Sequence, residues 1–357
     1  MRASRHISYL KGIYTMRSLI EVQKKLLPDL LLVMQKRYQI LQYIRLMQPI
    51  GRRSLSSSLG ISERILRGEV QFLKDQNLIE IFPAGMTLTK EGSHLLTVLE
   101  EAMKDVLGLT FLENTLKERL NLKKVIVVSG DSDQFSWVKK EMGRACVSCI
   151  KERLTGKNIV AVTGGTTIAA VAEMMTPDSK NREQLYVPAR GGLGENVENQ
   201  ANTICAKMAE RAMGNYRLLH VPDQLSKEAY LSITEEPSIK ELLALIKSSS
   251  MVVHGIGDAK TMAERRKTLP EDYIKIEQGE AVAEAFGYYF NQEGEVVHKV
   301  QTVGMQLSDL EKIQNVIAVA GGASKAGAIQ AYLKQAQGSI LITDEGAAKE
   351  LIRDIHP

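Results

Sequence analysis

The stretch NIVAVTGGTTIAAVAEM (residues 158–174) decides the fold. It begins as a short apolar run, turns at two glycines and continues with apolar residues at helical spacing. Similar runs rich in β-branched residues alternate with helical patterns at 125–129, 184–188, 216–221, 251–257, 316–322 and 339–344. Such alternation is typical of a mostly parallel sheet with helices on both faces. We therefore predict an α/β fold with a Rossmann-like parallel sheet for residues 123–357.

Two segments near this sheet have other patterns. Residues 287–300 alternate in polarity around Glu293-Gly294, which predicts a hairpin in or beside the sheet. Residues 95–120 form a leucine-rich helical stretch that leads into the domain. Its apolar stripe fits either packing within the subunit or contact with a partner.

The N-terminal part has the element order of a winged helix-turn-helix. Residues 36–48 and 52–59 predict two helices, and the second is followed by a tight turn at Gly60-Ile61. Ser62 caps a third helix, and residues 78–89 predict a two-stranded wing. Short helices joined by a glycine turn are the pattern of a DNA-binding helix-turn-helix.

The third helix predicts the DNA-reading surface. Its apolar positions are expected to be buried: Ile65, Leu66, Val70 and Leu73. Its other face is basic near the N-terminal half, which is the part of a recognition helix that reaches base edges. We predict DNA contacts from the polar residues of the second and third helices: Arg52, Arg53, Ser62, Arg64, Arg67 and Gln71. The alternative is a winged helix used only for protein contacts, with its arginines on a solvated face.

Charge is divided unevenly along the 357 residues. Residues 1–100 hold 15 Lys and Arg against 8 Asp and Glu, whereas the remainder holds 31 against 34. A basic end on a slightly acidic body is expected when that end meets a polyanion, either nucleic acid or an acidic membrane. No apolar run reaches the roughly 18 residues that a membrane span needs, so we expect no membrane-spanning segment.

The N-terminal segment and the cysteines bear on localisation. Residues 1–15 have no periodic pattern, so we expect a disordered extension, and they lack the apolar core of a signal peptide. Residues 16–35 predict an amphipathic helix that bends near Pro28. The three cysteines, Cys146, Cys149 and Cys205, agree with a reducing compartment and a cytoplasmic protein. Cys146 and Cys149 fall in a helical pattern, which is typical of buried structural thiols.

The segment Thr163-Gly164-Gly165-Thr166-Thr167 follows a buried strand directly and opens a helix. Glycines let backbone N–H groups approach an anion, the helix N-terminus adds favourable potential, and the threonine hydroxyls supply further donors. The segment has neither the GxxxxGK[ST] form nor the GxGxxG form, so it supports neither a nucleotide loop nor a dinucleotide site. A glycine turn between strand and helix also occurs for steric reasons alone, so the other strand ends matter.

Three more predicted strands end near glycines and cations. Arg190 lies among glycines after one strand, Arg265-Arg266 follow the His254 end of a second, and Lys325 follows two glycines after a third. Ligands of open α/β sheets gather beyond the carboxyl ends of the strands. These strand ends together indicate a ligand that carries more than one phosphate.

Five motifs carry a family resemblance: SLGISERILRGEVQFLK (58–74), TGGTT (163–167), PARGGLGENVENQANTI (188–204), HGIGDA (254–259) and VAGGASKAGAI (319–329). Over residues 16–355 the chain resembles SorC/DeoR-type sugar-responsive transcriptional repressors. The resemblance implies an effector domain related to sugar-phosphate isomerases, repression of a glycolytic operon, and fructose 1,6-bisphosphate as the effector that releases or remodels the repressor. It implies a homo-oligomer on operator DNA, dimer or tetramer, with no membrane partner. Because it begins at Met16, residues 1–15 are either an extension or lie upstream of the native start.

The resemblance also assigns site residues, by motif match. One phosphate would lie on Gly164, Gly165, Thr166 and Thr167, with Lys325 nearby. Arg190, Gln200 and Arg265 would hold the other phosphate or the sugar, and Glu284 would face the sugar. The implied domains are a winged helix-turn-helix (16–92), a helical linker (93–122) and an effector-binding domain (123–357), with no catalytic residue, metal ligand or cofactor.

An enzyme is the alternative function. A sugar-phosphate isomerase with an appended DNA-binding domain, or a transferase on the same fold, would need a base and a second acid–base group at the sugar carbons. Glu284 is the one obvious carboxylate for that role, and the DNA-binding module would be superfluous. We therefore predict a repressor. Among the six histidines, His254 alone is near the predicted site, either as part of its wall or as a core histidine.

Overall fold

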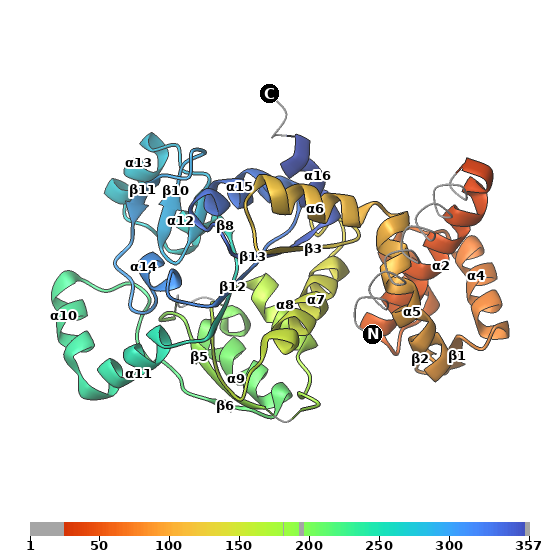
Figure 1. Ribbon diagram of the computed structural model, residues 1–357, viewed down its shortest axis with the longest axis horizontal. Helices are drawn as coiled ribbons and strands as arrows, with labels where there is room; N and C mark the ends of the chain where they lie inside the picture. Colours follow the sequence, from red (N-terminus) through yellow and green to blue (C-terminus); the bar gives the residue numbers. More distant parts are fainter. Residues whose placement is uncertain (1–24, 181, 193–195, 354–357) are drawn as a thin grey trace, which may run out of the picture. The chain divides into compact units, whose positions relative to one another are not determined.

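A computed structural model describes residues 25–180, 182–192 and 196–353 (Figure 1). The described residues form two compact units, of which the first ends at Phe111 and the second begins at Leu112. The predicted extension at 1–15 and the first part of the predicted helix at 16–35 lie outside the described residues. None of the described helices is long and apolar enough to cross a membrane.

The N-terminal unit has the elements of a winged helix-turn-helix in the predicted order. These are α2 (Pro28–Met47), α3 (Arg52–Leu59), α4 (Glu63–Asp75), the antiparallel strands β1 (Ile79–Phe82) and β2 (Gly85–Leu88), and α5 (Lys90–Val106). Gly60 ends α3 at φ 63°, a left-handed conformation that glycine adopts without strain. The Ser62 side chain then accepts the Ile65 N–H at 3.4 Å and caps α4. The predicted turn and cap are confirmed.

Two details of this unit differ from the sequence prediction. Residues 28–47 form one helix, whereas two helices that meet near residue 35 are expected from the pattern. Pro28 occupies the first turn of α2, where its missing N–H costs no hydrogen bond. Lys25 and Leu26 before it are also helical, and the helical conformation is interrupted at Leu27, next to the proline. Ile65 is 49% exposed, not buried. The buried face of α4 is set by Leu66 and by residues four and seven positions beyond it, and Ile65 lies about 100° away around the helix.

The larger unit is built on seven parallel strands in the order β3-β13-β12-β7-β4-β5-β6. Their bounds are β3 Lys124–Val128, β4 Lys157–Val162, β5 Glu183–Pro188, β6 Asn215–Tyr216, β7 Met251–His254, β12 Asn315–Val319 and β13 Ile340–Asp344. Because every pair is parallel, all the carboxyl ends lie at one edge of the sheet. The predicted α/β class and its parallel sheet are confirmed.

Helices cover both faces of this sheet (Figure 1). One face carries α7 (Trp137–Arg153), α8 (Thr166–Met174) and α9 (Ala201–Ala212), and the other carries α15 (Ala326–Gln335) and α16 (Glu345–Arg353). Other described helices are α6 (Leu109–Arg119), α10 (Lys227–Glu235), α11 (Pro237–Lys247) and α14 (Leu307–Leu310), with 3-10 turns η1 (Val197–Asn199) and η2 (Ala323–Lys325). This arrangement leaves the carboxyl edge of the sheet to the loops.

One predicted strand is shorter than expected. Of residues 216–221, only Tyr216 belongs to a strand, β6, at the edge of the sheet. The backbone of Leu219 instead exchanges two hydrogen bonds with the side-chain amide of Asn202, at 3.0 and 3.1 Å. Leu219 is fully buried, so the apolar pattern is correct about burial. Its backbone is satisfied by a side chain rather than by a neighbouring strand.

A small antiparallel sheet in the order β11-β10-β9-β8 lies beside the parallel sheet. Its strands are β8 (Gly257–Asp258), β9 (Ala283–Ala285), β10 (Tyr288–Phe290) and β11 (Val296–Lys299). The β10–β11 pair confirms the predicted hairpin. Strand β9 is too short to show a period in the sequence, which is why the prediction lacks it.

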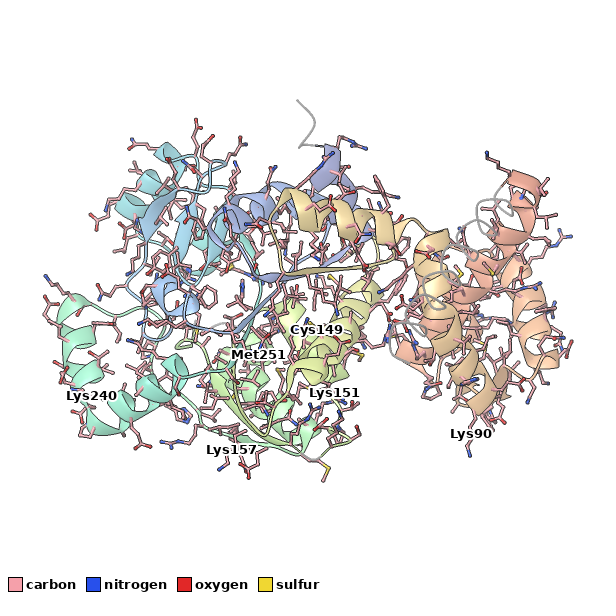
Figure 2. All side chains as sticks on the ribbon, in the orientation of Figure 1. Lys90, Cys149, Lys151, Lys157, Lys240 and Met251 are labelled. Carbon is pink, nitrogen blue, oxygen red and sulfur yellow. The ribbon has the colours of Figure 1, made fainter. Side chains whose placement is uncertain are left out.

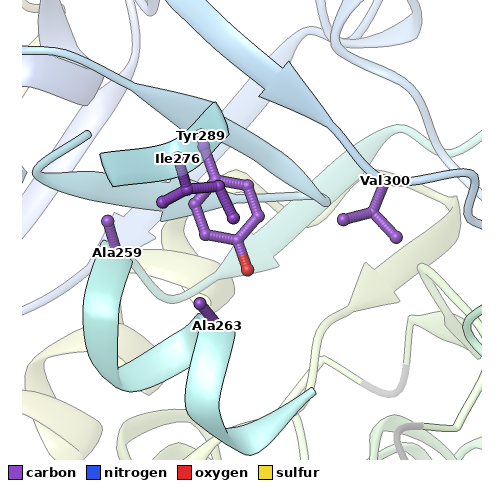
Figure 3. Close-up of a cluster of buried hydrophobic side chains, with 5 residues drawn as sticks. All are labelled: Ala259, Ala263, Ile276, Tyr289 and Val300. Carbon is purple, nitrogen blue, oxygen red and sulfur yellow. The ribbon is translucent and has the colours of Figure 1, made fainter. Parts of the chain in front are cut away.

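Figure 3 shows the buried cluster that holds α12 (Ala259–Arg265) to this small sheet. Tyr289 of β10 packs its ring against Ala259 and Ala263, and the cluster is completed by Ile276 of α13 (Pro270–Gln278) and by Val300. Alanine side chains let the helix approach the aromatic ring closely. The packing therefore fixes the end of α12, where two arginines follow each other.

The three cysteines are buried and free. Cys146 and Cys149 lie within α7 and Cys205 lies within α9. Burial raises the pKa of each thiol above its ordinary value, so the reactive thiolate is disfavoured. Figure 2 shows Cys149 inside the larger unit, whereas Lys157 is at its outer surface. The prediction of structural thiols is confirmed.

His254, at the end of β7, is a core histidine with both ring nitrogens hydrogen-bonded. Nδ1 lies 3.0 Å from the Gly255 carbonyl oxygen, which can only accept, so Nδ1 donates. Nε2 therefore accepts from the Tyr332 hydroxyl at 3.1 Å. Burial lowers the pKa of the imidazole to about 4, against weaker opposing effects of the Gly255 hydrogen bond and the Glu284 charge. The neutral ring belongs to the core rather than to a ligand site.

We predict that His254→Gln makes the fold less sensitive to acid. The imidazole pKa is about 4 in the folded chain and ~6.5 in the unfolded chain, so its contribution to stability is present above pH ~6.5 and is lost as the pH falls towards 4. From about pH 7.5 to about pH 5, wild type should lose about 2 kcal/mol more unfolding free energy than the variant. Urea denaturation followed by the fluorescence of Trp137, the single tryptophan, measures this. Equal losses in both proteins would contradict a buried neutral His254.

Candidate functional site

A pocket opens at the carboxyl edge of the parallel sheet. It is bordered by the loop after β4, the end of β5, the starts of α8 and α9, and parts of α12 and β9. Its lining includes all nine residues predicted to bind the effector: Gly164, Gly165, Thr166, Thr167, Arg190, Gln200, Arg265, Glu284 and Lys325. Folding thus brings together residues from both sheets of the larger unit.

The loop after β4 presents backbone N–H groups to the pocket. Gly165 has φ 114°, a conformation that other residues rarely adopt, and it directs the chain from β4 into α8 at Thr166. The Gly165 N–H donates to the Asn199 carbonyl at 2.8 Å, and a Cβ on Gly164 would lie 2.6 Å from the same oxygen. The loop therefore touches the segment where α9 begins, at Gln200. First-turn N–H groups have no intrahelical partner, so two helix starts at one pocket favour an anion.

Lys325 and Arg265 bring positive charge to this pocket. Burial lowers the pKa of the Lys325 ammonium, and the cations Lys139 and Arg265 lower it further, against the opposing effect of nearby aspartates. An anion bound beside these cations would offset both the desolvation and the mutual repulsion. The electrostatics of the pocket therefore suit a phosphate.

Three aspartates that the sequence analysis does not single out position the loop of Lys325. Their carboxylates accept backbone N–H groups of that loop: Asp131 from Ala323 at 3.4 Å, Asp133 from Ser324 at 2.8 Å and Asp344 from Gly322 at 2.8 Å. Asp131 and Asp344 stand at the ends of β3 and β13, where inspection of polar residues at strand ends could have found them. They fix the backbone that carries the lysine.

Arg190 and Glu284 belong to a buried cluster of four charges, which also contains Asp223 and Arg266. Each of the four is at most 7% exposed. Arg190 donates to Asp223 through Nε and Nη2, both at 2.7 Å, and to Glu284 through Nη1 at 3.4 Å. Arg266 donates to Asp223 at 2.6 Å and to Glu284 at 2.7 Å. Burial acts to lower the pKa of Arg190, but the two carboxylates outweigh it and raise that pKa.

This cluster changes the expected role of Arg190. A guanidinium among glycines is expected to grip a phosphate with two parallel N–H donors, but in the structure Asp223 occupies the Nε–Nη2 fork. Arg190 still lines the pocket. The sequence analysis misses Asp223, which lies in a loop without a motif, and it notes Arg266 merely as the neighbour of Arg265.

The exposed face of α3 and α4 carries the residues predicted to bind DNA. Five of them are exposed: Arg52, Arg53, Arg64, Arg67 and Gln71. Ser62 is exposed as well, but its side-chain oxygen caps α4. The wing strands contain no Lys or Arg, so the cations of this face come from the two helices.

Comparisons with known proteins agree with this architecture. The family of CggR N-terminal DNA-binding domains matches residues 33–103, and a sugar-binding domain family matches residues 104–353. The structure of a SorC family transcriptional regulator from Enterococcus faecalis has a TM-score of 0.65 and 47% identity, and it covers 68% of this chain and 99% of that one. The chain belongs to the SorC family of transcriptional regulators. The resemblance drawn from its motifs is confirmed.

Relatives of this SorC family regulator cover nearly its whole length. The central glycolytic genes regulator of Bacillus subtilis is 73% identical over 339 residues, 95% of this chain and 100% of that protein. That of Priestia megaterium is 73% identical over 342 residues, 96% and 100% of the two chains. The full-length sorbitol operon regulator SorC of Klebsiella pneumoniae shares the fold, with a TM-score of 0.64 at 18% identity over 85% and 94% of the chains. The protein is a DNA-binding transcriptional regulator, which sets aside the isomerase and transferase alternatives.

Proposed function

We propose that this SorC family regulator represses a glycolytic operon, and that fructose 1,6-bisphosphate bound in the pocket releases it from the operator or remodels it there. One observation carries the proposal: a single pocket combines the start of a helix, three cations and a carboxylate, on a chain with a DNA-binding domain. Similarity to regulators of central glycolytic genes supports a glycolytic operon as the target of repression. Such a regulator acts on operator DNA in the cytoplasm.

The distribution of charge supports a ligand with two phosphates. We assign one phosphate to Lys325 and the loop after β4, with Gly164, Thr166 and Thr167 as donors. Gly165, whose N–H donates to the Asn199 carbonyl, shapes the turn at this phosphate. We assign the second phosphate to Arg265 and Gln200, and the sugar to Glu284 and Arg190. A bisphosphate carries about four negative charges near neutral pH, because the second pKa of each phosphate is ~6. A monophosphate fills one of the two regions, so it should bind more weakly and switch the regulator poorly.

We assign DNA recognition to residues 16–92, the linker to 93–122 and effector binding to 123–357. Within the DNA-binding part, Arg64 and Arg67 stand in the N-terminal half of α4, the half that reaches base edges in this fold. Gln71 follows one turn later on the same face. The residues near the starts of α3 and α4 are assigned to phosphates: Arg52, Arg53 and Ser62.

Replacing Arg67 with alanine should weaken operator binding by about 1–3 kcal/mol and relax the preference at one base pair. The matched variant Arg53→Ala should weaken binding to all sequences alike and flatten its salt dependence, because a phosphate contact carries no base information. Fluorescence anisotropy with operator and scrambled duplexes at several salt concentrations separates the two effects. If Arg67→Ala binds the operator as wild type does, the recognition face is placed wrongly.

We propose that the regulator binds its operator as a dimer or tetramer. A single winged helix makes few phosphate contacts, and specific sites usually pair half-sites about 34 Å apart. Apolar side chains are exposed on the described parts of the two leucine-rich stretches, 19–34 and 95–120: Leu30, Leu32, Val98 and Phe111. These are candidate contact surfaces between copies of the chain. Analytical ultracentrifugation should show two or four chains per operator, and one chain per operator would contradict the assembly.

The effector response gives the test of the whole proposal. A coupling of about 1–3 kcal/mol would loosen operator binding about 5–150-fold on addition of fructose 1,6-bisphosphate in a mobility-shift titration. Thr167→Ala and Arg265→Ala should bind the operator yet require far more sugar, because each removes a phosphate donor. Arg217→Ala, an exposed arginine outside the pocket, is the matched control.

The outcomes separate the assignments of single residues from the site as a whole. If one variant responds at wild-type sugar concentrations, the role of that residue is wrong. If both do, the effector binds elsewhere. Fructose 6-phosphate added to wild type should release the operator weakly at most, and release equal to that by the bisphosphate would contradict the requirement for two phosphates.

A further inference from the structure

The buried four-charge cluster has two members that border the pocket, Arg190 and Glu284, and two that lie behind them, Asp223 and Arg266. We propose that Asp223 and Arg266 are positioning residues of the effector pocket. They hold the Glu284 carboxylate with one oxygen towards the ligand, which makes the site select phosphate esters that carry hydroxyl groups. The inference rests on the proposed function, because it concerns the same pocket.

The hydrogen bonds to Glu284 are concentrated on one oxygen. Oε1 accepts Arg266 at 2.7 Å, the Gly287 N–H at 2.7 Å and Arg190 at 3.4 Å. Within the described part of the chain, no hydrogen bond goes to Oε2. Oε2 lies beside Gly257, where a Cβ would be 3.5 Å from it, and both residues line the pocket. Glu284 therefore has one saturated oxygen and one that is available to a ligand.

The chemistry of that free oxygen determines what it can bind. An ionised carboxylate only accepts hydrogen bonds, so it attracts a hydroxyl group and repels a phosphate. The ionised state needs a nearby cation, because burial of an unpaired carboxylate is costly. Arg266 supplies that cation at 2.7 Å from Oε1 without itself bordering the pocket.

Asp223 keeps the two arginines in place. Its Oδ1 accepts Arg190 at 2.7 Å, and its Oδ2 accepts Arg190 at 2.7 Å and Arg266 at 2.6 Å. Its backbone N–H donates to the Gly192 carbonyl at 2.9 Å, which ties the carboxylate to the loop that follows Arg190. With Asp223 present, two guanidiniums face two carboxylates and the cluster is neutral. Without Asp223, the Nε and Nη2 donors of Arg190 could turn towards Glu284 or the ligand.

The position of Arg266 follows from the packing of α12. The helix is fixed by the cluster around Tyr289 (Figure 3), and Arg265 and Arg266 are consecutive at its end. Arg265 lines the pocket, whereas Arg266 is 5% exposed and bonded to the two carboxylates. One arginine therefore borders the pocket, and its neighbour orients the carboxylate that the ligand meets.

The test compares two bisphosphates on the full chain by isothermal titration calorimetry. Fructose 1,6-bisphosphate has hydroxyl groups between its phosphates, and hexane-1,6-diol bisphosphate has none. Arg266→Gln should weaken the binding of fructose 1,6-bisphosphate by at least about 10-fold, because the charged hydrogen bond that orients Glu284 is lost. It should change the affinity for hexane-1,6-diol bisphosphate by less than about twofold. Asp223→Asn, which keeps the size of the side chain, should shift selectivity in the same direction. Arg217→Gln, an exposed arginine paired with Glu241, should change neither affinity.

A merely structural role would have a different signature. Loss of one partner from a buried ion pair destabilises a fold, and a loosened pocket would weaken both bisphosphates alike, which overturns the inference. If Arg266→Gln does not fold, Arg266→Lys and Asp223→Asn take its place in the test. Each of them must then lose more affinity for fructose 1,6-bisphosphate than for hexane-1,6-diol bisphosphate. Should wild type bind both bisphosphates equally, the selectivity is absent and only the inference falls. Should wild type fail to bind fructose 1,6-bisphosphate, the proposed function falls with it.

Discussion

Parallel pairing of the seven-stranded sheet is the constraint on which the pocket at its carboxyl edge depends. Every strand of a parallel sheet directs its carboxyl end to one edge, so loops that are far apart in the sequence meet there. The helix starts after β4 and β5 bring free N–H groups to that edge, and η2 and α12 bring cations. No single motif of the chain forms an anion site. The site arises because one topology collects several weak local features.

The same constraint explains which site residues leave a trace in the sequence. Gly164-Gly165 follow β4 directly and Lys325 follows β12 closely. In the sequence, both therefore come shortly after an apolar run that predicts a strand, where they can be recognised. Asp223 has no such order. Its partners Arg190 and Arg266 are 33 and 43 residues away, and the preceding segment has the pattern of a strand of which only Tyr216 becomes part. Contacts between side chains in loops arise only when the chain folds, so they cannot be predicted from the sequence and are seen only in the structure.

Errors in the predicted fold occur where one pattern has two physical outcomes. A proline interrupts a helix interior but is equally compatible with a first turn, and Pro28 takes the second role. A buried apolar residue fits a strand or a loop whose backbone is bonded by a side chain, as Leu219 is by Asn202. For Leu219 the periodicity was right about burial, whereas Leu30 and Leu32 beside Pro28 are exposed. The hydrogen-bond partner, which decides the element, came from elsewhere in the chain.

The pocket joins two parts of the larger unit, and this bears on how a sugar could act on DNA binding. Gly164 to Thr167 and Lys325 belong to the parallel sheet, whereas Arg265 and Glu284 belong to the small sheet and its helix. Arg190 joins the two parts through its bond to Glu284, and buried ion pairs of this kind add little net stability while fixing one arrangement. A ligand shifts an equilibrium only by its difference in affinity between two arrangements. Under the function we propose, a bisphosphate that reaches both parts gains all its contacts only when they are joined, and this difference in affinity is the free energy available to change operator binding.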